Sequence, residues 1–313
     1  MFSLDGYRAI RTTAALVPRM DRAILGVSGQ DRTTWLQGLV TNDVVSLPSG
    51  ERRYAAYLTP QGRMITDAYL VALPDRLLLE VPAPLAASLR GRLDGLIFAE
   101  DVQVVDESAR MAVWGVYGPD ASAVRSAGPS GPAFRDPSFG VPGVIFYLDR
   151  SQPMPATLAA LPQVDLESLD VVRIEAGTPR FLIDMTDDTI PLEAGIEDRA
   201  ISFTKGCYVG QEVIVRVTTR GGGRVAKRLV RLRIEAGARS PEPSALGSAK
   251  IFSGDRDIGR VTSAAFSPDQ NRVVALGYVH RDFVDPGTDV TVAWDDVRAQ
   301  AVVAADDRPM KIE

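Results

Sequence analysis

The chain has 313 residues, of which 45% are hydrophobic and 24% are charged, proportions typical of a soluble globular protein. The formal net charge of -5 argues against a dedicated nucleic-acid-binding protein, and no apolar run approaches the ~18 residues that a membrane-spanning helix needs. A chain of this length can bury a sizeable core and is expected to form two or three domains.

Cysteine and histidine are scarce, since the chain contains only Cys207 and His280. One cysteine cannot form an intrachain disulfide, and the N-terminal segment lacks a signal-peptide pattern, so we expect a cytoplasmic protein. A zinc site of cysteine and histidine ligands needs more of them than one chain has. An iron–sulfur cluster ordinarily takes four thiolates, of which this chain could give one. We therefore expect no metal site held by the chain alone.

Apolar residues repeat at strand and helix spacing through the first part of the chain. We expect strands at 23–28, 54–58, 64–72, 76–81, 111–117 and 144–148. We expect helices at 31–39, 84–96 and 165–177, the last capped by Asp165 and ended by Gly177. The stretch 127–143, rich in glycine, proline and serine, is expected to be a flexible surface loop. Strands that mostly follow one another, with few helices between them, predict an α+β fold with antiparallel sheets.

The composition changes at Gly221-Gly222-Gly223, where we expect a domain boundary between 1–223 and 224–313. Beyond the glycines, alternating apolar residues predict short strands at 228–234, 249–252, 258–266, 273–279, 289–294 and 298–304. Short strands at this spacing, without helices, are typical of a small barrel or sandwich.

A run of basic residues lies near this boundary: Arg216, Arg220, Arg224, Lys227, Arg228, Arg231 and Arg233. Such a strip could bind nucleic acid, but it also matches the polar faces of a helix and a strand in an acidic chain. We favour the second interpretation and expect neither a direct nucleic-acid partner nor a membrane partner.

The single cysteine lies in a polar, glycine-rich segment, Lys205-Gly206-Cys207-Tyr208-Val209-Gly210-Gln211-Glu212. A buried structural cysteine would more often stand in an apolar run. Apolar residues at helical spacing follow, so a helix is expected to open at Gly210-Gln211, with Cys207 just before it. The partial positive charge of a helix N-terminus and the ammonium of Lys205 would both favour a thiolate. We therefore predict an exposed, reactive thiol.

Three segments, taken in order, resemble a known family. The first runs from Leu36 to Val44 and continues in the hairpin from Tyr57 to Met64. The second runs from Arg173 through Arg180 to Gly195, and the third is the cysteine segment. Together they resemble the folate-binding family that includes the glycine-cleavage T-protein, and most closely its YgfZ branch, which the cysteine segment marks.

The resemblance implies that region 1–223 wraps a central cavity for tetrahydrofolate, as two subdomains, beside a β-barrel-like region 224–313. The glutamate that hydrogen-bonds the pterin ring in T-proteins falls on Glu175. A carboxylate offers two coplanar acceptors to the paired donors of a pterin edge. Arg180 and Phe181 follow in the same segment, and Phe181 replaces a T-protein tyrosine, which keeps a stacking surface and loses a hydroxyl. The catalytic aspartate pair of the T-proteins is reduced to Asp67.

We therefore expect a YgfZ-like folate-binding protein that assists the assembly or repair of iron–sulfur clusters in client enzymes, including enzymes that modify tRNA. Cys207, helped by Lys205, would carry out transient ligation or thiol exchange with client or assembly proteins. The alternative is a tetrahydrofolate-dependent aminomethyltransferase or other one-carbon transferase, with Asp67 as the general base or cation-stabilising carboxylate. A third interpretation, a cysteine hydrolase or transferase using Cys207 and His280, is less favoured because His280 follows a strand of the C-terminal region.

Overall fold

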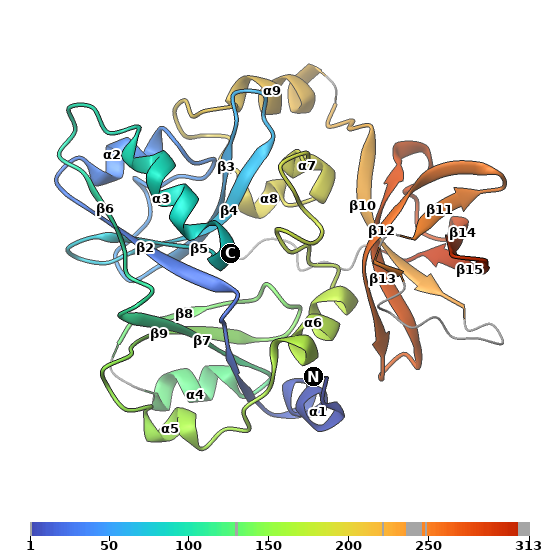
Figure 1. Ribbon diagram of the computed structural model, residues 1–313, viewed down its shortest axis with the longest axis horizontal. Helices are drawn as coiled ribbons and strands as arrows, with labels where there is room; N and C mark the ends of the chain where they lie inside the picture. The colour runs from blue at the N-terminus through green and yellow to red at the C-terminus, as the bar shows by residue number, and fades with distance from the viewer. Residues whose placement is uncertain (1, 129–130, 221, 236–245, 248, 306–313) are drawn as a thin grey trace.

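The computed structural model describes residues 2–128, 131–220, 222–235, 246–247 and 249–305. Two open β-sheets with their helices form one side of the molecule and a closed β-barrel forms the other, as Figure 1 shows. Neighbouring strands run antiparallel in all three sheets. The predicted α+β architecture is confirmed.

The first sheet has the strand order β3-β4-β5-β2-β6. Its strands are β2 (Arg22–Ser28), β3 (Arg52–Leu58), β4 (Met64–Ala72), β5 (Leu77–Pro82) and β6 (Gln103–Asp106). Two helices, α2 (Arg32–Gln37) and α3 (Ala86–Asp94), share a hydrophobic core with it. The helical residues of that core are all buried: Trp35, Leu36, Ala86, Leu89 and Leu93.

The second sheet has the strand order β1-β7-β9-β8. Its strands are β1 (Ala15–Pro18), β7 (Met111–Tyr117), β8 (Ala133–Arg135) and β9 (Gly143–Asp149). One face packs against α4 (Ala121–Ala127) and α5 (Ala156–Ala159). The opposite face shares a core with α1 (Leu4–Thr12) and α6 (Leu166–Glu175). The two open sheets are thus layered with helices, and α6 lies between them and the barrel (Figure 1).

Part of this sheet corrects a prediction. The stretch 127–143 was expected to be a flexible surface loop, but it contains β8 and packs inward in the part that the structure describes. Phe134 and Phe139 are buried, and the buried carboxylate of Asp136 accepts a hydrogen bond from the Tyr117 hydroxyl at 2.9 Å. The glycines and prolines set the turns, while two aromatic side chains and one carboxylate anchor the segment.

The barrel closes in the order β10-β13-β12-β11-β14-β15. Its strands are β10 (Lys227–Ile234), β11 (Lys250–Ser253), β12 (Arg256–Ser267), β13 (Arg272–His280), β14 (Asp289–Trp294) and β15 (Val297–Val303). All six predicted strands are confirmed, and they form a barrel rather than a sandwich. Gly221 lies outside the described residues, so the boundary predicted at the three glycines stays a prediction.

Between the sheets and the barrel runs a segment with three short helices, α7 (Pro191–Ala194), α8 (Glu197–Ala200) and α9 (Gln211–Val215). A buried ion pair holds this segment to α6, since Arg173 Nη1 donates to Asp184 at 2.6 Å. Ser263 of β12 donates to the same carboxylate at 2.6 Å and accepts from Arg173 Nη2 at 2.9 Å. One buried cluster thus joins α6, the connecting segment and the barrel.

Local sequence signals explain how α6 begins and ends. The side chain of Asp165 caps the helix by accepting a hydrogen bond from the Ser168 amide at 2.8 Å. Gly177, just beyond the helix, has a φ of 76°, which a glycine adopts without steric cost. The prediction for this helix is confirmed at both ends.

Buried opposite charges join the two open sheets. The carboxylate of Glu80 on β5 accepts from Arg22 at 3.1 Å, from Arg52 at 3.0 Å and from the Tyr147 hydroxyl at 2.6 Å. Tyr147 belongs to β9, so the hydrogen bonds cross from one sheet to the other. Burial by itself would raise the pKa of Glu80, but Arg52 and Arg22 outweigh it and hold the pKa below its ordinary value.

We predict that Glu80→Gln lowers the free energy of unfolding by about 3 kcal/mol, because two buried guanidinium groups, Arg22 and Arg52, each lose one of their carboxylate partners. Urea denaturation of the purified protein measures this loss. Asp257→Asn is the control, since it breaks an ion pair with the exposed Lys250 and is expected to cost less than about 1 kcal/mol. Equal, small losses in the two variants would contradict the prediction.

Candidate functional site

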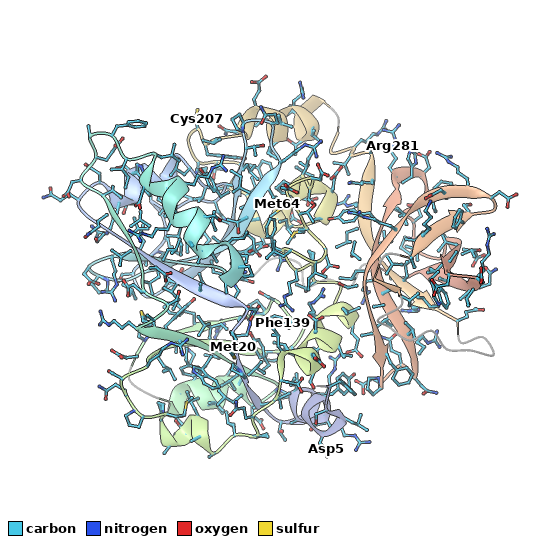
Figure 2. All side chains as sticks on the ribbon, in the orientation of Figure 1. Asp5, Met20, Met64, Phe139, Cys207 and Arg281 are labelled. Carbon is cyan, nitrogen blue, oxygen red and sulfur yellow. The ribbon has the colours of Figure 1, made fainter. Side chains whose placement is uncertain are left out.

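A pocket lies where the two open sheets meet the segment that follows α6. Its volume is about 350 Å³, within the range of small-ligand sites. The charged and aromatic residues that line it are Arg19, Asp21, Arg22, Tyr54, Asp67, Tyr69, Phe139, Arg173, Arg180, Phe181 and Arg199. Exposed apolar side chains of Met20, Leu182 and Ile183 form its rim. Figure 2 labels two lining residues, Met20 and Phe139, at the junction of the sheets.

Asp67 supplies a carboxylate to this pocket, at the position expected from the sequence. Its side chain is buried, with Oδ1 accepting from Arg22 at 2.9 Å and Oδ2 accepting from the Tyr54 hydroxyl at 3.0 Å. Burial raises the pKa of Tyr54, and the charge of Asp67 raises it further, so the hydroxyl stays a donor. Each carboxylate oxygen has a second acceptor site, so the fixed Asp67 can still accept from a ligand.

Arg180 and Phe181, which the sequence also predicts for this site, line the same pocket. The guanidinium of Arg180 donates to Asp170 at 3.2 Å, and Phe181 packs into the neighbouring core. The next residue, Leu182, has a φ of 73°, which is costly for a residue with a branched side chain. The rim of the pocket therefore contains a strained, exposed apolar residue.

Glu175 does not line this pocket, so the structure gives no support to its predicted pterin contact. Its carboxylate accepts from the Tyr7 hydroxyl at 2.9 Å and forms an ion pair with Arg11, and both partners lie on α1. Residues two positions apart on a helix point roughly 200° apart, so Arg173 faces the pocket while Glu175 faces α1. The carboxylate fastens α1 to α6.

Three pocket residues had no clear signal in the sequence. Arg22 opens an apolar strand, Tyr54 lies within one, and Arg199 belongs to the four-residue helix α8. The Arg199 guanidinium lies 4.5 Å from the centre of the Tyr54 ring, a cation–π contact. Strand and helix patterns report burial, whereas these contacts arise only when separate elements pack together. An arginine at the start of an otherwise apolar strand is the one hint that the sequence offered.

The cysteine segment forms a loop between α8 and α9. Cys207 is exposed at its tip, as predicted, and a Cβ atom added to Gly206 would meet nothing within 4 Å. The amide of Ser202 donates to the Thr41 carbonyl at 3.1 Å before the tip, and the amide of Val209 donates to the Gly38 carbonyl at 3.2 Å after it. The loop is thus held on both sides of a free tip.

The other residues of the segment build its base. Tyr208 is buried, and burial raises its pKa to about 12. Gly210 has a φ of 84° and immediately precedes α9, which begins at Gln211 with the exposed Glu212 in its first turn. The predicted helix start is confirmed, although the helix is short.

Lys205 is half-buried and points toward the backbone that follows α2. Its Nζ donates to the carbonyls of Gln37 at 2.6 Å, Val40 at 2.7 Å and Asn42 at 3.0 Å. An ammonium has three donors, so these carbonyls engage all of them. Burial lowers the pKa of Lys205 to about 8. Its described hydrogen bonds go to backbone carbonyls, and the expectation that its charge favours the thiolate stays a prediction.

The pocket and the cysteine loop contact different parts of the β3–β4 hairpin. Tyr54 and Asp67 lie within β3 and β4, and the turn that joins these strands packs against the base of the cysteine loop, because a Cβ atom on Gly210 would lie 2.5 Å from the Thr59 carbonyl oxygen. Figure 1 shows this hairpin tip beside α9. Cys207 does not line the pocket, and Figure 2 shows it well apart from Phe139.

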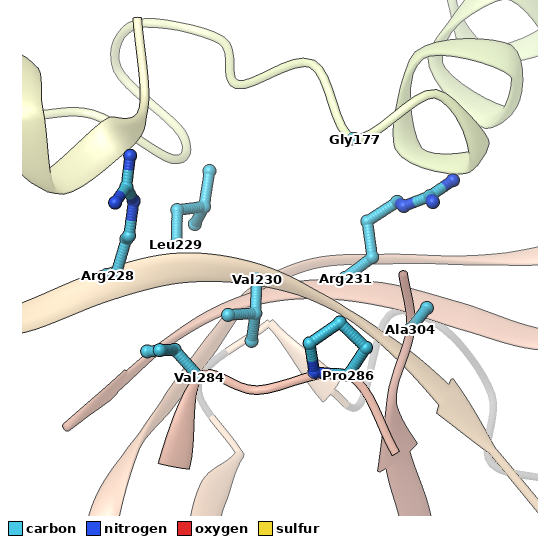
Figure 3. Close-up of a pocket in the computed structure, with 8 residues that line it drawn as sticks. All are labelled: Gly177, Arg228, Leu229, Val230, Arg231, Val284, Pro286 and Ala304. Atoms are coloured by element: carbon cyan, nitrogen blue, oxygen red, sulfur yellow. The ribbon is translucent and has the colours of Figure 1, made fainter. Parts of the chain in front are cut away.

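A second cavity, of about 230 Å³, lies between the barrel and the segment after α6, and Figure 3 shows its lining. Two arginines of β10 border it. Arg228 donates to the Glu197 carboxylate at 2.8 Å, and Arg231 donates to the Glu175 carbonyl at 2.6 Å. These guanidinium groups tie the barrel to α6 and α8, so the cavity is a gap in an internal interface.

His280 and Cys207 do not form a catalytic pair. His280 ends β13, and its Nδ1 lies 3.3 Å from a carboxylate oxygen of Asp282. Figure 2 shows Arg281, the next residue, on the barrel and far from Cys207. The geometry therefore gives no support to a cysteine hydrolase.

In the part of the chain that the structure describes, no group of three or more histidine, cysteine, aspartate or glutamate residues could hold a metal ion. No helix there is long and apolar enough to cross a membrane.

Two parts of this chain match two domains of one family. The GCVT N-terminal domain matches residues 3–128, and the glycine cleavage T-protein C-terminal barrel domain matches residues 227–307. The crystal structure of glycine cleavage system aminomethyltransferase T from Bartonella henselae has the same fold, with a TM-score of 0.84 over 98% of this chain and 91% of that chain, at 22% identity. The chain belongs to the T-protein-like family.

Its curated relatives include iron-sulfur cluster assembly factors and aminomethyltransferases. The iron-sulfur cluster assembly factor IBA57 homolog of Phaeosphaeria nodorum is 29% identical over 248 residues, which cover 74% of this chain and 59% of that protein. The IBA57 assembly factor of Mus musculus is 29% identical over 69% of this chain and 66% of its own length. An aminomethyltransferase of Thermosynechococcus vestitus is 26% identical over 96% of this chain and 86% of its own length. The chain thus spans less than two thirds of the two assembly factors.

We predict that Gly210→Ala destabilises the protein by about 1–3 kcal/mol, because its backbone is left-handed and its added Cβ would collide with the Thr59 carbonyl. Gly206→Ala is the matched control, four residues away, where the added Cβ meets open space, and its effect is expected to stay within about 0.5 kcal/mol. Thermal unfolding of both variants measures the difference. An equal effect of the two substitutions would show that the loop base is not packed as described.

Proposed function

We propose that this chain is a YgfZ-like, tetrahydrofolate-binding protein that assists the assembly or repair of iron–sulfur clusters in client enzymes, including enzymes that modify tRNA. The observation that carries the proposal is the combination of a T-protein fold with one exposed cysteine, held at the tip of a loop whose base is fixed. Relatives that share the fold and are named iron-sulfur cluster assembly factors support it.

The chemistry of the pocket suits a reduced folate. Asp67 offers a fixed, buried acceptor for the donors of a pterin edge, and Phe181 and Tyr54 offer apolar and aromatic surface. Arg180 and Arg199 bring positive charge that favours the carboxylates of a folate tail. When bound, a reduced folate supplies nitrogen atoms that carry one-carbon units. Asp67 would hold and orient it, with Arg22 and Tyr54 keeping the carboxylate in place.

In this function the iron–sulfur cluster is the cargo, and Cys207 would act on it. One thiolate can take one coordination position on a cluster or enter one exchange reaction, but it cannot hold a cluster that ordinarily takes four thiolates. Cys207 is exposed, so a partner protein can reach the sulfur without opening the fold. The remaining ligands would come from the client or from an assembly protein. We propose that these partners are proteins of the cytoplasm and that neither nucleic acid nor membrane is bound directly.

The second candidate is a tetrahydrofolate-dependent aminomethyltransferase or other one-carbon transferase. Asp67 favours it, because a buried carboxylate that lines a pocket can accept a proton or stabilise a cation next to a bound folate. Relatives named aminomethyltransferase match most of the chain. In this function Cys207 would be dispensable, whereas in the first it is essential.

We predict that Asp67→Asn weakens tetrahydrofolate binding about tenfold or more, because a charge-assisted hydrogen bond is replaced by a neutral one. Isothermal titration calorimetry on variants that are folded by circular dichroism measures the change. Glu175→Gln is the control, since that carboxylate faces α1, and its affinity is expected to stay within about twofold of the parent. Stronger weakening by Glu175→Gln than by Asp67→Asn would return the pterin contact to Glu175.

We predict that Cys207→Ala fails to restore an iron–sulfur enzyme that modifies tRNA in cells lacking the protein, while Asp67→Asn restores at least part of that activity. The reason is that the thiol would touch the cluster or its carrier, whereas Asp67 would touch the folate alone. Levels of the modified nucleoside, normalised to the amount of each variant, give the readout. Full restoration by Cys207→Ala, with purified protein turning over an aminomethyl donor and tetrahydrofolate, would establish the transferase instead.

A further inference from the structure

We infer that Lys205 is a positioning residue that holds the cysteine loop in place through three backbone carbonyls. This assignment deepens the proposed role of Cys207. It rests on that role only for the purpose that a fixed cysteine loop would serve. The hydrogen bonds themselves are a property of the fold.

The three carbonyls converge on one point. Gln37 is the last residue of α2, and Val40 and Asn42 belong to the chain that leaves this helix. The last carbonyls of a helix have no partner within the helix and need donors from elsewhere. Lys205 supplies donors to all three acceptors at 2.6 to 3.0 Å from a site that is half-buried.

The same stretch of backbone anchors the loop at two more points. Thr41 accepts from the Ser202 amide, and Gly38 accepts from the Val209 amide. Three positions of the loop are therefore fixed to residues 37–42, one before Lys205, one at it and one after Cys207. Between Lys205 and Val209, Gly206 and Cys207 are exposed, while Tyr208 is buried. Of these three anchors to residues 37–42, the one at Lys205 acts through a side chain of the loop, so a substitution at 205 removes it and leaves the other two in place.

Arginine cannot replace this lysine. Three carbonyls directed at one point match the radiating donors of an ammonium, whereas the donors of a guanidinium lie in a plane and spread over a wider fork. If Lys205 acted on the sulfur by charge alone, arginine would serve nearly as well. If the geometry of the three hydrogen bonds matters, Lys205→Arg is expected to loosen the loop. If charge alone matters, Lys205→Arg is expected to behave like the parent.

The test uses the purified full-length protein without folate or cluster. Hydrogen exchange of the Ser202 and Val209 amides is measured in the parent, Lys205→Met and Lys205→Arg, together with the pH midpoint of Cys207 alkylation by iodoacetamide. We expect exchange at both amides to rise about tenfold or more in each variant, because partly buried carbonyls lose their donors. We expect the alkylation midpoint to stay where it is in the parent.

Lys250→Met is the control, because it removes an exposed lysine from the barrel and should change neither readout. If Lys205→Met does not fold, Lys205→Gln takes its place in the same measurements. Parent-like exchange in the variants would overturn the assignment, whether the alkylation midpoint moves or not. The assignment would also be overturned if the pH midpoint of Cys207 alkylation rises in Lys205→Met and returns to the parent value in Lys205→Arg. A failure of the cluster-assembly role would appear in cells and leave these loop measurements unchanged, so the two proposals can fail separately.

Discussion

The burial of opposite charges between the two open sheets is the constraint on which the rest of the structure depends. Glu80 has no exposed surface, and it is tolerated there because two guanidinium groups and a tyrosine hydroxyl supply its donors. Arg22 also holds Asp67, so the carboxylate that fixes the sheets also fixes, through one shared arginine, the carboxylate of the pocket. Asp67 is therefore held by Arg22 and Tyr54 of its own sheet, and Arg22 is itself held by the carboxylate at the junction of the sheets.

Much of the fold follows from sequence patterns, because alternation, caps and turn residues are local. The six barrel strands, the cap of α6 at Asp165 and the exposed tip at Cys207 are all of this kind. The site was only partly predictable. Glu175 was expected in the pocket because its motif was considered without the rotation of its helix, which turns it toward Arg11. Lys205 was assigned to its neighbour in sequence, whereas its actual partners lie more than a hundred and fifty residues away.

The fold itself does not choose between the two proposed functions. The fold forms a pocket of about 350 Å³ that Asp67 lines, and both candidates need that pocket. The cysteine loop is the feature that distinguishes the two candidates, because only the first of them needs the thiol of Cys207. Several backbone and side-chain contacts fix its base, and these contacts leave a single sulfur at the tip. A loop that served only to connect α8 to α9 would not need this arrangement.

The β3–β4 hairpin extends from the pocket to the base of the cysteine loop, so about the length of a strand separates the two. Three residues of β3 lie between Tyr54 at the pocket and Leu58 at the turn, which places these two residues about 13 Å apart. Asp67 lines the pocket and Cys207 does not. The rim of the pocket, with Met20 and Leu182 exposed, lies away from the tip that carries Cys207. In the proposed function, a protein docked over Cys207 would therefore leave this rim uncovered, and the small molecule could be exchanged for another while the two proteins stay together.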